Sequence, residues 1–137
     1  MAVITTALDA SVDASTAMFA PQVTGLLAGE DLALCGPCYL KSSDGLVYKS
    51  NGTALNEAAE FLGISPRGAK LGEAVTIYGQ STRFRVSAGS LVPGDFYFVA
   101  ATAGAWDSAA TIGDTVGTIQ AVSTTDAIVC RRLSRGS

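Results

Sequence analysis

The segment Cys35-Gly36-Pro37-Cys38 is the part of the sequence whose residue types and spacing most directly suggest chemistry. Two cysteines separated by two residues are typical of thiol–disulfide redox centres. That chemistry needs the first cysteine at the start of a helix, because the helix N-terminus lowers the pKa of its thiol. The sequence instead runs into Ser42-Ser43-Asp44-Gly45, which is a turn signal. We therefore favour a tight Gly-Pro turn that carries two small apolar side chains, and keep a thiol oxidoreductase as an alternative.

The same cysteines make a poor set of metal ligands. The chain has three cysteines, Cys35, Cys38 and Cys130, and no histidine. A closed structural zinc site needs four nitrogen or sulfur ligands, so we predict no metal site. An odd number of cysteines is also a poor disulfide framework and fits a reducing compartment.

Other catalytic and cofactor patterns are incomplete. The segment 63–70 almost spells a phosphate-binding loop, but Ala69 separates Gly68 from Lys70, and a strand pattern follows where a helix is needed. Catalysis by a Ser–His pair is excluded without histidine. Glu57 and Glu60 fit a solvated helix face better than an acid/base pair. The sequence therefore predicts an exposed turn at 63–70, no cofactor and a protein that is not an enzyme.

The composition narrows the possible partners. The 137 residues include 12 acidic and 9 basic ones, for a net charge of −3, so the basic footprint of a nucleic-acid-binding protein is missing. The longest early uncharged run, 14–29, falls short of the about 20 apolar residues that span a bilayer. The N-terminus lacks the basic start of a signal peptide, which favours synthesis in a cytoplasm. Because 48% of the residues are hydrophobic and only 15% are charged, we expect a buried subunit interface and neither a nucleic-acid nor a membrane partner.

Short strand-like segments predict an all-β fold from residue 29 onward. The clearest are 74–78, 83–86 and the apolar run 96–99. Further strands are expected at 32–34, 39–40, 46–49, 61–64, 116–122 and 127–130, with turns at 43–45 and 51–52 and a short helix at 54–60. Many short strands with glycine-rich turns favour a small barrel or sandwich.

The first 28 residues have a different character. They are rich in alanine, threonine and serine and show no clear period, apart from one short strand expected at Val3 and Ile4. We therefore divide the chain into an extended N-terminal arm, residues 1–28, and a β-barrel body, residues 29–137. The arm is either a floppy terminus or a segment that orders on a partner by adding a strand to its sheet.

Several short motifs, each weak by itself, become informative because of the order in which they follow one another. They are Gly29-Glu30-Asp31-Leu32, Ser43-Asp44-Gly45-Leu46-Val47, Phe61-Leu62-Gly63-Ile64, Gly72-Glu73-Ala74-Val75-Thr76-Ile77 and Val92-Pro93-Gly94-Asp95-Phe96-Tyr97. In this order, and with the Ala/Thr-rich segment before them, the region 29–133 resembles the small head-decoration (cement) proteins of tailed bacteriophages.

The resemblance implies a small β-barrel or β-tulip without an active site. Such a protein sits as a homotrimer on the outer capsid surface of the virion, at three-fold positions of an icosahedral head, and clamps the major capsid protein. On this hypothesis, Val3, Ile4 and Phe19 supply arm contacts with the capsid, and the region from Phe96 and Tyr97 to Trp106 lies near a subunit interface. From the residues alone, Phe96 is expected in the ordinary core in preference to an interface, and for Trp106 core and interface stay equally open. Another virion component, such as a fibre base or vertex protein, also stays open. Deletion of the arm is expected to abolish capsid binding and leave the body folded.

Overall fold

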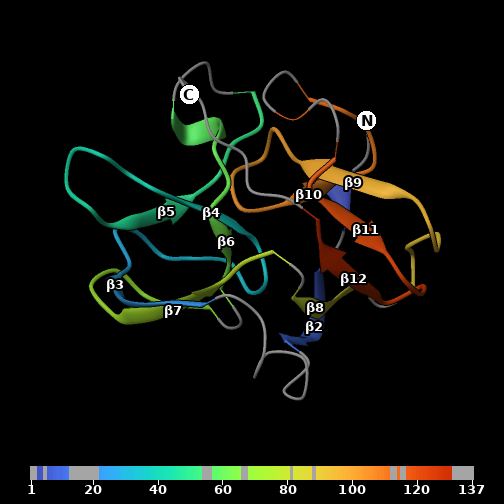
Figure 1. Cartoon of the computed structure of the whole chain (residues 1–137), viewed down its shortest axis with the longest axis horizontal. Helices are drawn as coiled ribbons and strands as arrows, with labels where there is room; N and C mark the ends of the chain where they lie inside the picture. The colour runs from blue at the N-terminus through green and yellow to red at the C-terminus, as the bar shows by residue number, and fades with distance from the viewer. Residues whose placement is uncertain are drawn as a thin grey trace.

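The computed structural model describes residues 3–4, 6–12, 22–53, 57–65, 68–80, 82–87, 89–111, 114 and 117–130. Their strands form two antiparallel sheets, which lie on the right and on the left in Figure 1. In sheet order, the seven-stranded sheet consists of β1 (Val3–Ile4), β10 (Trp106–Asp107), β9 (Phe96–Val99), β11 (Ile119–Ala121), β12 (Asp126–Val129), β8 (Arg83–Ser87) and β2 (Thr6–Val12). The five-stranded sheet consists of β3 (Gln22–Leu27), β7 (Ala74–Tyr78), β6 (Gly63–Ile64), β4 (Pro37–Leu40) and β5 (Val47–Lys49).

The seven-stranded sheet curls into a nearly closed barrel. Its two edge strands, β1 and β2, are separated by a single residue in the chain. In β1, Val3 is the register partner of Asp107, while in β2 Thr6 is the register partner of Ser87. One short stretch of chain thus pairs with β10 on one side and with β8 on the other, which brings the two edges of the sheet together. The all-β, barrel-like fold predicted from the sequence is confirmed.

The five-stranded sheet is inserted between β2 and β8 of the barrel and closes at one end. Ala28, which follows β3, forms a parallel bridge with Val47 of β5. The backbone N–H of Gly29 donates to the Val47 carbonyl at 2.8 Å. The Glu30 carboxylate then accepts the backbone N–H of Lys49 at 2.9 Å. These bonds satisfy the edge of β5, which an open sheet would leave exposed to other chains.

The N-terminal region differs from the extended arm predicted for residues 1–28. β1 confirms the short strand predicted at Val3 and Ile4. However, β2 and β3 also pair inside the two sheets, so the described N-terminal strands are part of the folded body. The sequence missed β3 because Gly25, at φ 80°, lies where the register shifts between Val23 and Leu26 and interrupts the alternation. The remaining residues of this segment, including Phe19, lie outside the described part.

Most of the other predicted strands are confirmed. β5, β7, β8, β9 and β12 match their predicted segments to within a residue or two. The segment 32–34 contributes only an isolated bridge between Leu32 and Ala69. Of the helix predicted at 54–60, the described part contains the 3₁₀ helix η1 (Glu57–Ala59). Within the described ranges, no helix is long and apolar enough to cross a membrane.

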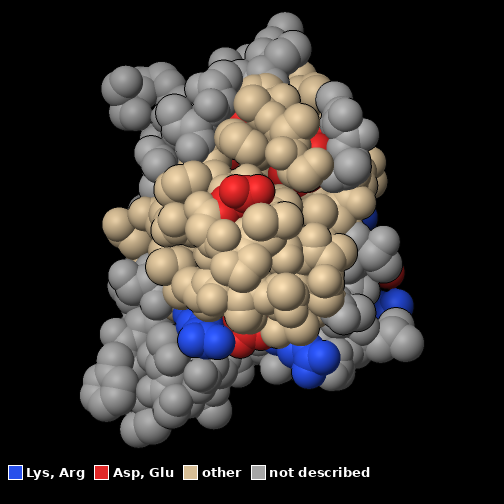
Figure 2. Space-filling model, turned by 90° about the vertical axis from the view of Figure 1, so that its right-hand side faces the viewer, with Lys and Arg blue, Asp and Glu red and all other residues tan. Residues whose placement is uncertain are grey.

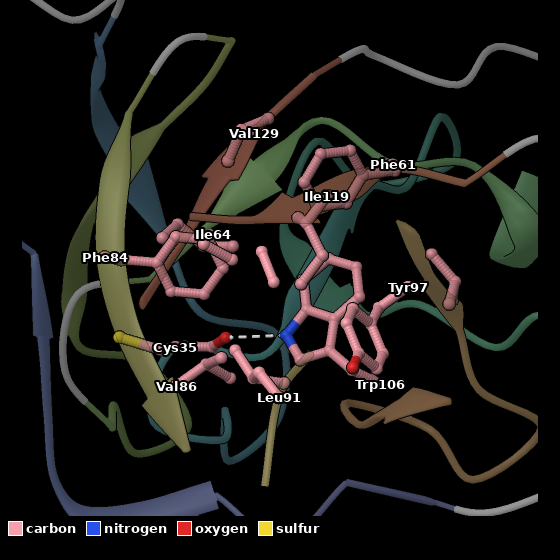
Figure 3. Close-up of a cluster of buried hydrophobic side chains, with 13 residues drawn as sticks. Cys35, Phe61, Ile64, Phe84, Val86, Leu91, Tyr97, Trp106, Ile119 and Val129 are labelled. Carbon is pink, nitrogen blue, oxygen red and sulfur yellow. Dashed lines mark hydrogen bonds between the residues drawn. The ribbon is translucent and has the colours of Figure 1, made fainter. Parts of the chain in front are cut away.

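Two groups of buried side chains hold the sheets together. The first group fills the barrel and includes Trp106, Phe84, Val86 and Ile119 (Figure 3). The inserted unit contributes three further side chains to this group, Cys35, Phe61 and Ile64. The second group lies within the five-stranded unit and consists of Ala28, Leu32, Cys38, Val47, Ala69, Val75 and Ile77. Because the first group draws on both sheets, the barrel and the insertion share a core and stabilise each other.

Deletion of residues 1–12 is expected to destabilise the whole protein and not only to remove an arm. It takes hydrogen-bonding strands from β8 and β10 and reopens the barrel. A loss of at least about 3 kcal/mol would lower the thermal midpoint by roughly 10 °C, measured by circular dichroism. The control is Val3→Ser, which changes an exposed side chain but keeps the strand pairing. An unchanged midpoint in the deletion would contradict this closure of the barrel.

Candidate interaction surface

Strand β9 separates the residues predicted to lie at an interface into two groups. Successive side chains of a strand point to opposite faces of the sheet. Phe96 points outward and is 40% exposed, whereas Tyr97 points inward and is 3% exposed. In β1, Val3 is 47% exposed, and Ile4 is half-buried against the barrel core. Phe96 and Val3 are therefore available to a partner, and Tyr97 is not.

Trp106 corrects the prediction of a subunit interface at that position. Its side chain is 1% exposed and lies in the middle of the barrel core (Figure 3). The indole N–H donates to the Cys35 carbonyl at 3.0 Å. The ring meets Phe61 edge-on, with centroids 5.6 Å apart, and lies tilted against Phe84 at 6.3 Å. Because alanine and glycine precede Trp106, no alternation of apolar and polar residues indicated whether its side chain points into the core or outward.

Tyr97 also has a supporting role in place of the predicted surface contact. Its ring lies in the core, and its hydroxyl oxygen accepts the backbone N–H of Val92 at 2.9 Å. This bond ties the turn before β9 to the strand itself. Val92 is 54% exposed, so Tyr97 positions a surface residue from the inside.

An apolar surface lies on the side of the barrel that carries Phe96. Register partners in neighbouring strands share a face. Phe96 is the partner of Gln120, and Gln120 is the partner of Ile128, so the three form one outward row. We call the set Val3, Val92, Phe96, Phe98, Gln120, Val122 and Ile128 the outer face. Each of these side chains is exposed or partly exposed.

Figure 2 shows this side of the molecule, with uncharged residues over much of its centre. Basic side chains lie toward its lower margin. On the same face, β8 carries Arg83, whose guanidinium pairs with the carboxylate of Asp126 at 3.0 Å. Asp95, in the turn before Phe96, is exposed. The outer face thus combines apolar side chains with Gln120, and on this side of the molecule charged groups lie both among the uncharged residues and toward the edge. A mixture of apolar and polar groups is usual in a protein–protein interface.

Backbone contacts hold the outer face in a fixed shape. The N–H of Gly94 donates to the Ala121 carbonyl at 2.8 Å, and the N–H of Ala121 donates to the Asp95 carbonyl at 2.9 Å. The Gln120 amide donates to the Gly94 carbonyl at 3.1 Å. Gly117, at φ 93°, lies so close to Phe96 that a side chain at this position would clash with the ring. A surface fixed in this way loses little conformational entropy when a partner binds.

A buried carboxylate that the sequence analysis missed supports the same strand. Asp114 is 1% exposed, and its carboxylate accepts the backbone N–H groups of Val99 and Gly117 at 2.9 and 3.0 Å. It also accepts the hydroxyl of Thr118 at 2.6 Å. These bonds fasten the loop after β10 to β9, which gives Asp114 a structural role. In the sequence, the one available sign of this role was the spacing of Asp114 and Gly117, because an aspartate can accept the backbone N–H of a residue three positions later.

The two thiols of the Cys-Gly-Pro-Cys segment are buried and face different cores. Cys35 packs in the barrel core and Cys38 in the core of the five-stranded unit. Burial raises the pKa of each thiol to about 12. The chain turns at Leu34 and Cys35, the latter at φ 51°, and Pro37 is the first residue of strand β4. The predicted turn is therefore confirmed, but it lies just before the Gly-Pro pair and not at it. A thiol oxidoreductase depends on an accessible thiolate, and neither cysteine provides one.

The described residues also form neither a metal site nor the phosphate-binding loop that the segment 63–70 resembles. There, no group of three or more histidine, cysteine, aspartate or glutamate residues is placed to hold a metal ion. In the segment 63–70, Ala69 forms a bridge with Leu32, and Lys70 precedes the exposed turn that leads into β7. The strand β7 follows in place of the helix that a phosphate-binding loop requires. The prediction of an exposed turn at 63–70 is wrong for most of its described residues: 63–65 are buried and include β6, and Ala69 is 3% exposed, whereas Gly68 and Lys70 are exposed.

No protein-family model and no curated protein matches the sequence. The fold defines the class: an all-β protein with a barrel-like sheet and an inserted five-stranded unit. Within this class, the function is argued from the outer face and from the chemistry of the buried groups.

Trp106→Ala and Phe96→Ala are expected to lower the free energy of unfolding by different amounts, because Trp106 lies in the core and Phe96 at the surface. Loss of the buried indole should lower the free energy of unfolding by about 3–5 kcal/mol, because a large cavity results and the buried hydrogen bond to the Cys35 carbonyl is lost. Phe96→Ala should cost less than about 1 kcal/mol, since the ring is already partly in water. Urea denaturation measures both. Equal losses would contradict the assignment of the two residues.

The thiols should resist alkylation in the native protein. Because the folded pKa of Cys35 and Cys38 is about 12, only about one thiol in 10⁴ is ionised at pH 8, and iodoacetamide should label them only after unfolding. Cys130, which is partly exposed, serves as the internal control and should react first. Mass spectrometry of peptides from a time course identifies the labelled residue.

The same burial predicts loss of stability in alkali. The thiols of the unfolded chain ionise above a pKa near 9, while those of the folded chain stay protonated up to about 12. The free energy of unfolding should therefore fall as the pH rises from 9 toward 12. In the double variant Cys35→Ala/Cys38→Ala this part of the decline should be absent, and an unchanged decline would contradict the prediction.

Proposed function

We propose that the protein is a capsid decoration protein, which binds the outer surface of an icosahedral phage head as a homotrimer and stabilises the shell. The observation that carries the proposal is the outer face: an apolar, largely uncharged surface on a rigid sheet. A large exposed apolar patch on a small protein marks an interaction site. The kind of partner, the major capsid protein, comes from the resemblance of the motifs and their order to those of head-decoration proteins.

The chemistry of the buried groups supports a structural role over a catalytic one. The carboxylate of Asp114 accepts three hydrogen bonds from its own chain, and both thiols of the Cys-Gly-Pro-Cys segment lie in cores. A decoration protein needs a stable body and contact area, and it needs no reactive group or cofactor.

Stabilisation of the shell follows from mass action. A protein that binds the assembled lattice and not the free capsid subunits shifts the equilibrium toward the lattice. A trimer strengthens this effect, because one bound subunit holds the other two at a high effective concentration near their sites. Many weak apolar contacts are then enough, and no single contact has to be tight.

A quantified protein gel of purified virions from the source tests the proposal. We expect a band of 13.9 kDa in nearly equimolar amount to the major capsid protein, because decoration covers the whole lattice. A trace amount would instead indicate a vertex or fibre component. Absence of the band would overturn a virion role altogether.

A further inference from the structure

The pair Asn51-Gly52 lies where the inserted unit is hydrogen-bonded to the barrel. The backbone N–H of Gly52 donates to the carbonyl of Ala100, the residue after β9, at 2.8 Å. In the other direction, the N–H of Gly104 donates to the carbonyl of Ser50 at 3.0 Å. We call the segments 50–52 and 100–104 together the junction. The chemistry of an asparagine followed by a glycine is thereby placed at a contact between the two parts of the molecule.

An asparagine that precedes a glycine can lose its side-chain amide without an enzyme. The backbone nitrogen of the glycine attacks the carbonyl carbon of the side chain, a new C–N bond forms, and ammonia leaves with the proton of that nitrogen. Water then opens the resulting succinimide ring at one of its two carbonyls. The product is either an aspartyl residue or an isoaspartyl residue, whose main chain runs through the former side chain. Glycine favours the attack because it has no side chain to obstruct the approach.

The structure prepares the electrophile of this reaction but restrains the nucleophile. The Oδ1 atom of Asn51 accepts the backbone N–H and the hydroxyl of Thr53, both at 2.9 Å. Two donors on this oxygen stabilise the negative charge that develops there during attack. The nitrogen of Gly52, however, keeps its proton in the hydrogen bond to Ala100. Gly52 is also buried, with its backbone packed directly against the carbonyl of Val99.

We propose that Asn51 is a deamidation site that the fold keeps unreactive and that becomes reactive when the junction opens. Separation of the segments 50–52 and 100–104 releases the N–H of Gly52 from Ala100 and lets its nitrogen turn toward the Asn51 side chain. Folded proteins open locally at a lower cost in free energy than complete unfolding. The deamidation of Asn51 therefore measures how often the barrel and the insertion part at this contact. This proposal is independent of the proposed function.

The two products should differ in their ability to fold. The aspartyl product keeps the original main chain and an oxygen that can accept the N–H of Thr53. The isoaspartyl product has one additional carbon in the main chain before Gly52. That carbon displaces the Gly52 N–H from the Ala100 carbonyl, and the buried backbone at Val99 leaves no space for the shift. A chain that forms isoaspartate while unfolded is therefore expected to be unable to rebuild the junction.

Comparison of the native and the urea-unfolded full chain tests the restraint. Both samples are aged in mildly alkaline buffer, and the tryptic peptide 50–67 is followed by tandem mass spectrometry. Asn51 should react at least about a hundredfold more slowly in the native protein, because the reaction waits for the junction to open. Asn56 lies in the same peptide but precedes Glu57, so it serves as the internal control and should stay unmodified. Equal rates for Asn51 in the two samples would overturn the proposal.

Two glycine variants distinguish opening of the junction from complete unfolding. Gly104 and Gly45 have similar left-handed backbones, at φ 80° and 72°. A Cβ at Gly104 would lie 2.7 Å from Cδ of Lys49, whereas a Cβ at Gly45 would meet open space. Both Gly104→Ala and Gly45→Ala therefore strain the backbone, but only Gly104 belongs to the junction.

Gly104→Ala should speed the native reaction of Asn51 about tenfold, from the cost of a left-handed alanine next to the restrained segment. Gly45→Ala should leave the native rate within about twofold of the original, because its strain acts on a remote turn. The rates in the unfolded chains should be equal, and thermal unfolding confirms that both variants are folded. Equal acceleration by the two variants would mean that Asn51 reacts through complete unfolding, which would overturn the role of the junction.

Refolding of the aged, unfolded protein tests the fate of the two products. Size-exclusion chromatography separates refolded from aggregated chains, and enzymatic methylation detects isoaspartate in each fraction. We expect isoaspartate only in the aggregated fraction, while the variant Asn51→Asp refolds like the original protein. Isoaspartate at equal levels in both fractions would show that the junction accepts the longer main chain, and the inference about refolding would be wrong.

Discussion

The hydrogen bond from the Trp106 indole to the Cys35 carbonyl joins the two parts of the molecule. Trp106 belongs to the barrel, and Cys35 belongs to the inserted unit. The bond is buried, so neither group has water as an alternative partner. The rings of Phe61 and Phe84, one from each part, lie against the same indole. These contacts set the orientation of the insertion on the barrel.

Period-2 patterns made much of the sheet predictable from the sequence. In β8, Arg83 and Arg85 alternate with Phe84 and Val86, and the structure places the two apolar side chains in the core. In β9 the same reasoning gave the strand but not its faces, because the run 96–99 is apolar on both sides. Which of Phe96 and Tyr97 faces outward depends on pairing with β11, a partner distant in sequence.

The site was harder to predict than the fold, for a related reason. The sequence singled out aromatic residues as contacts, but two of them, Tyr97 and Trp106, are the internal supports of the surface. Val122 and Ile128 are ordinary aliphatic residues in the sequence, and only their exposure in the folded chain identifies them as surface residues. The Cys-Gly-Pro-Cys segment carried a clear chemical signal, yet its strand context turns both thiols into packing groups.

The pairing of β1 and β2 with β10 and β8 has a consequence for synthesis on the ribosome. The strand β1 cannot pair until β10, about a hundred residues later in the chain, has been synthesised. The inserted unit draws its strands from the one continuous stretch 22–78, so its pairings become possible much earlier. We expect the nascent chain to carry unpaired N-terminal strands while the insertion forms. During that interval the unpaired strands could pair with those of neighbouring nascent chains, unless these chains are far apart or chaperones cover the strands.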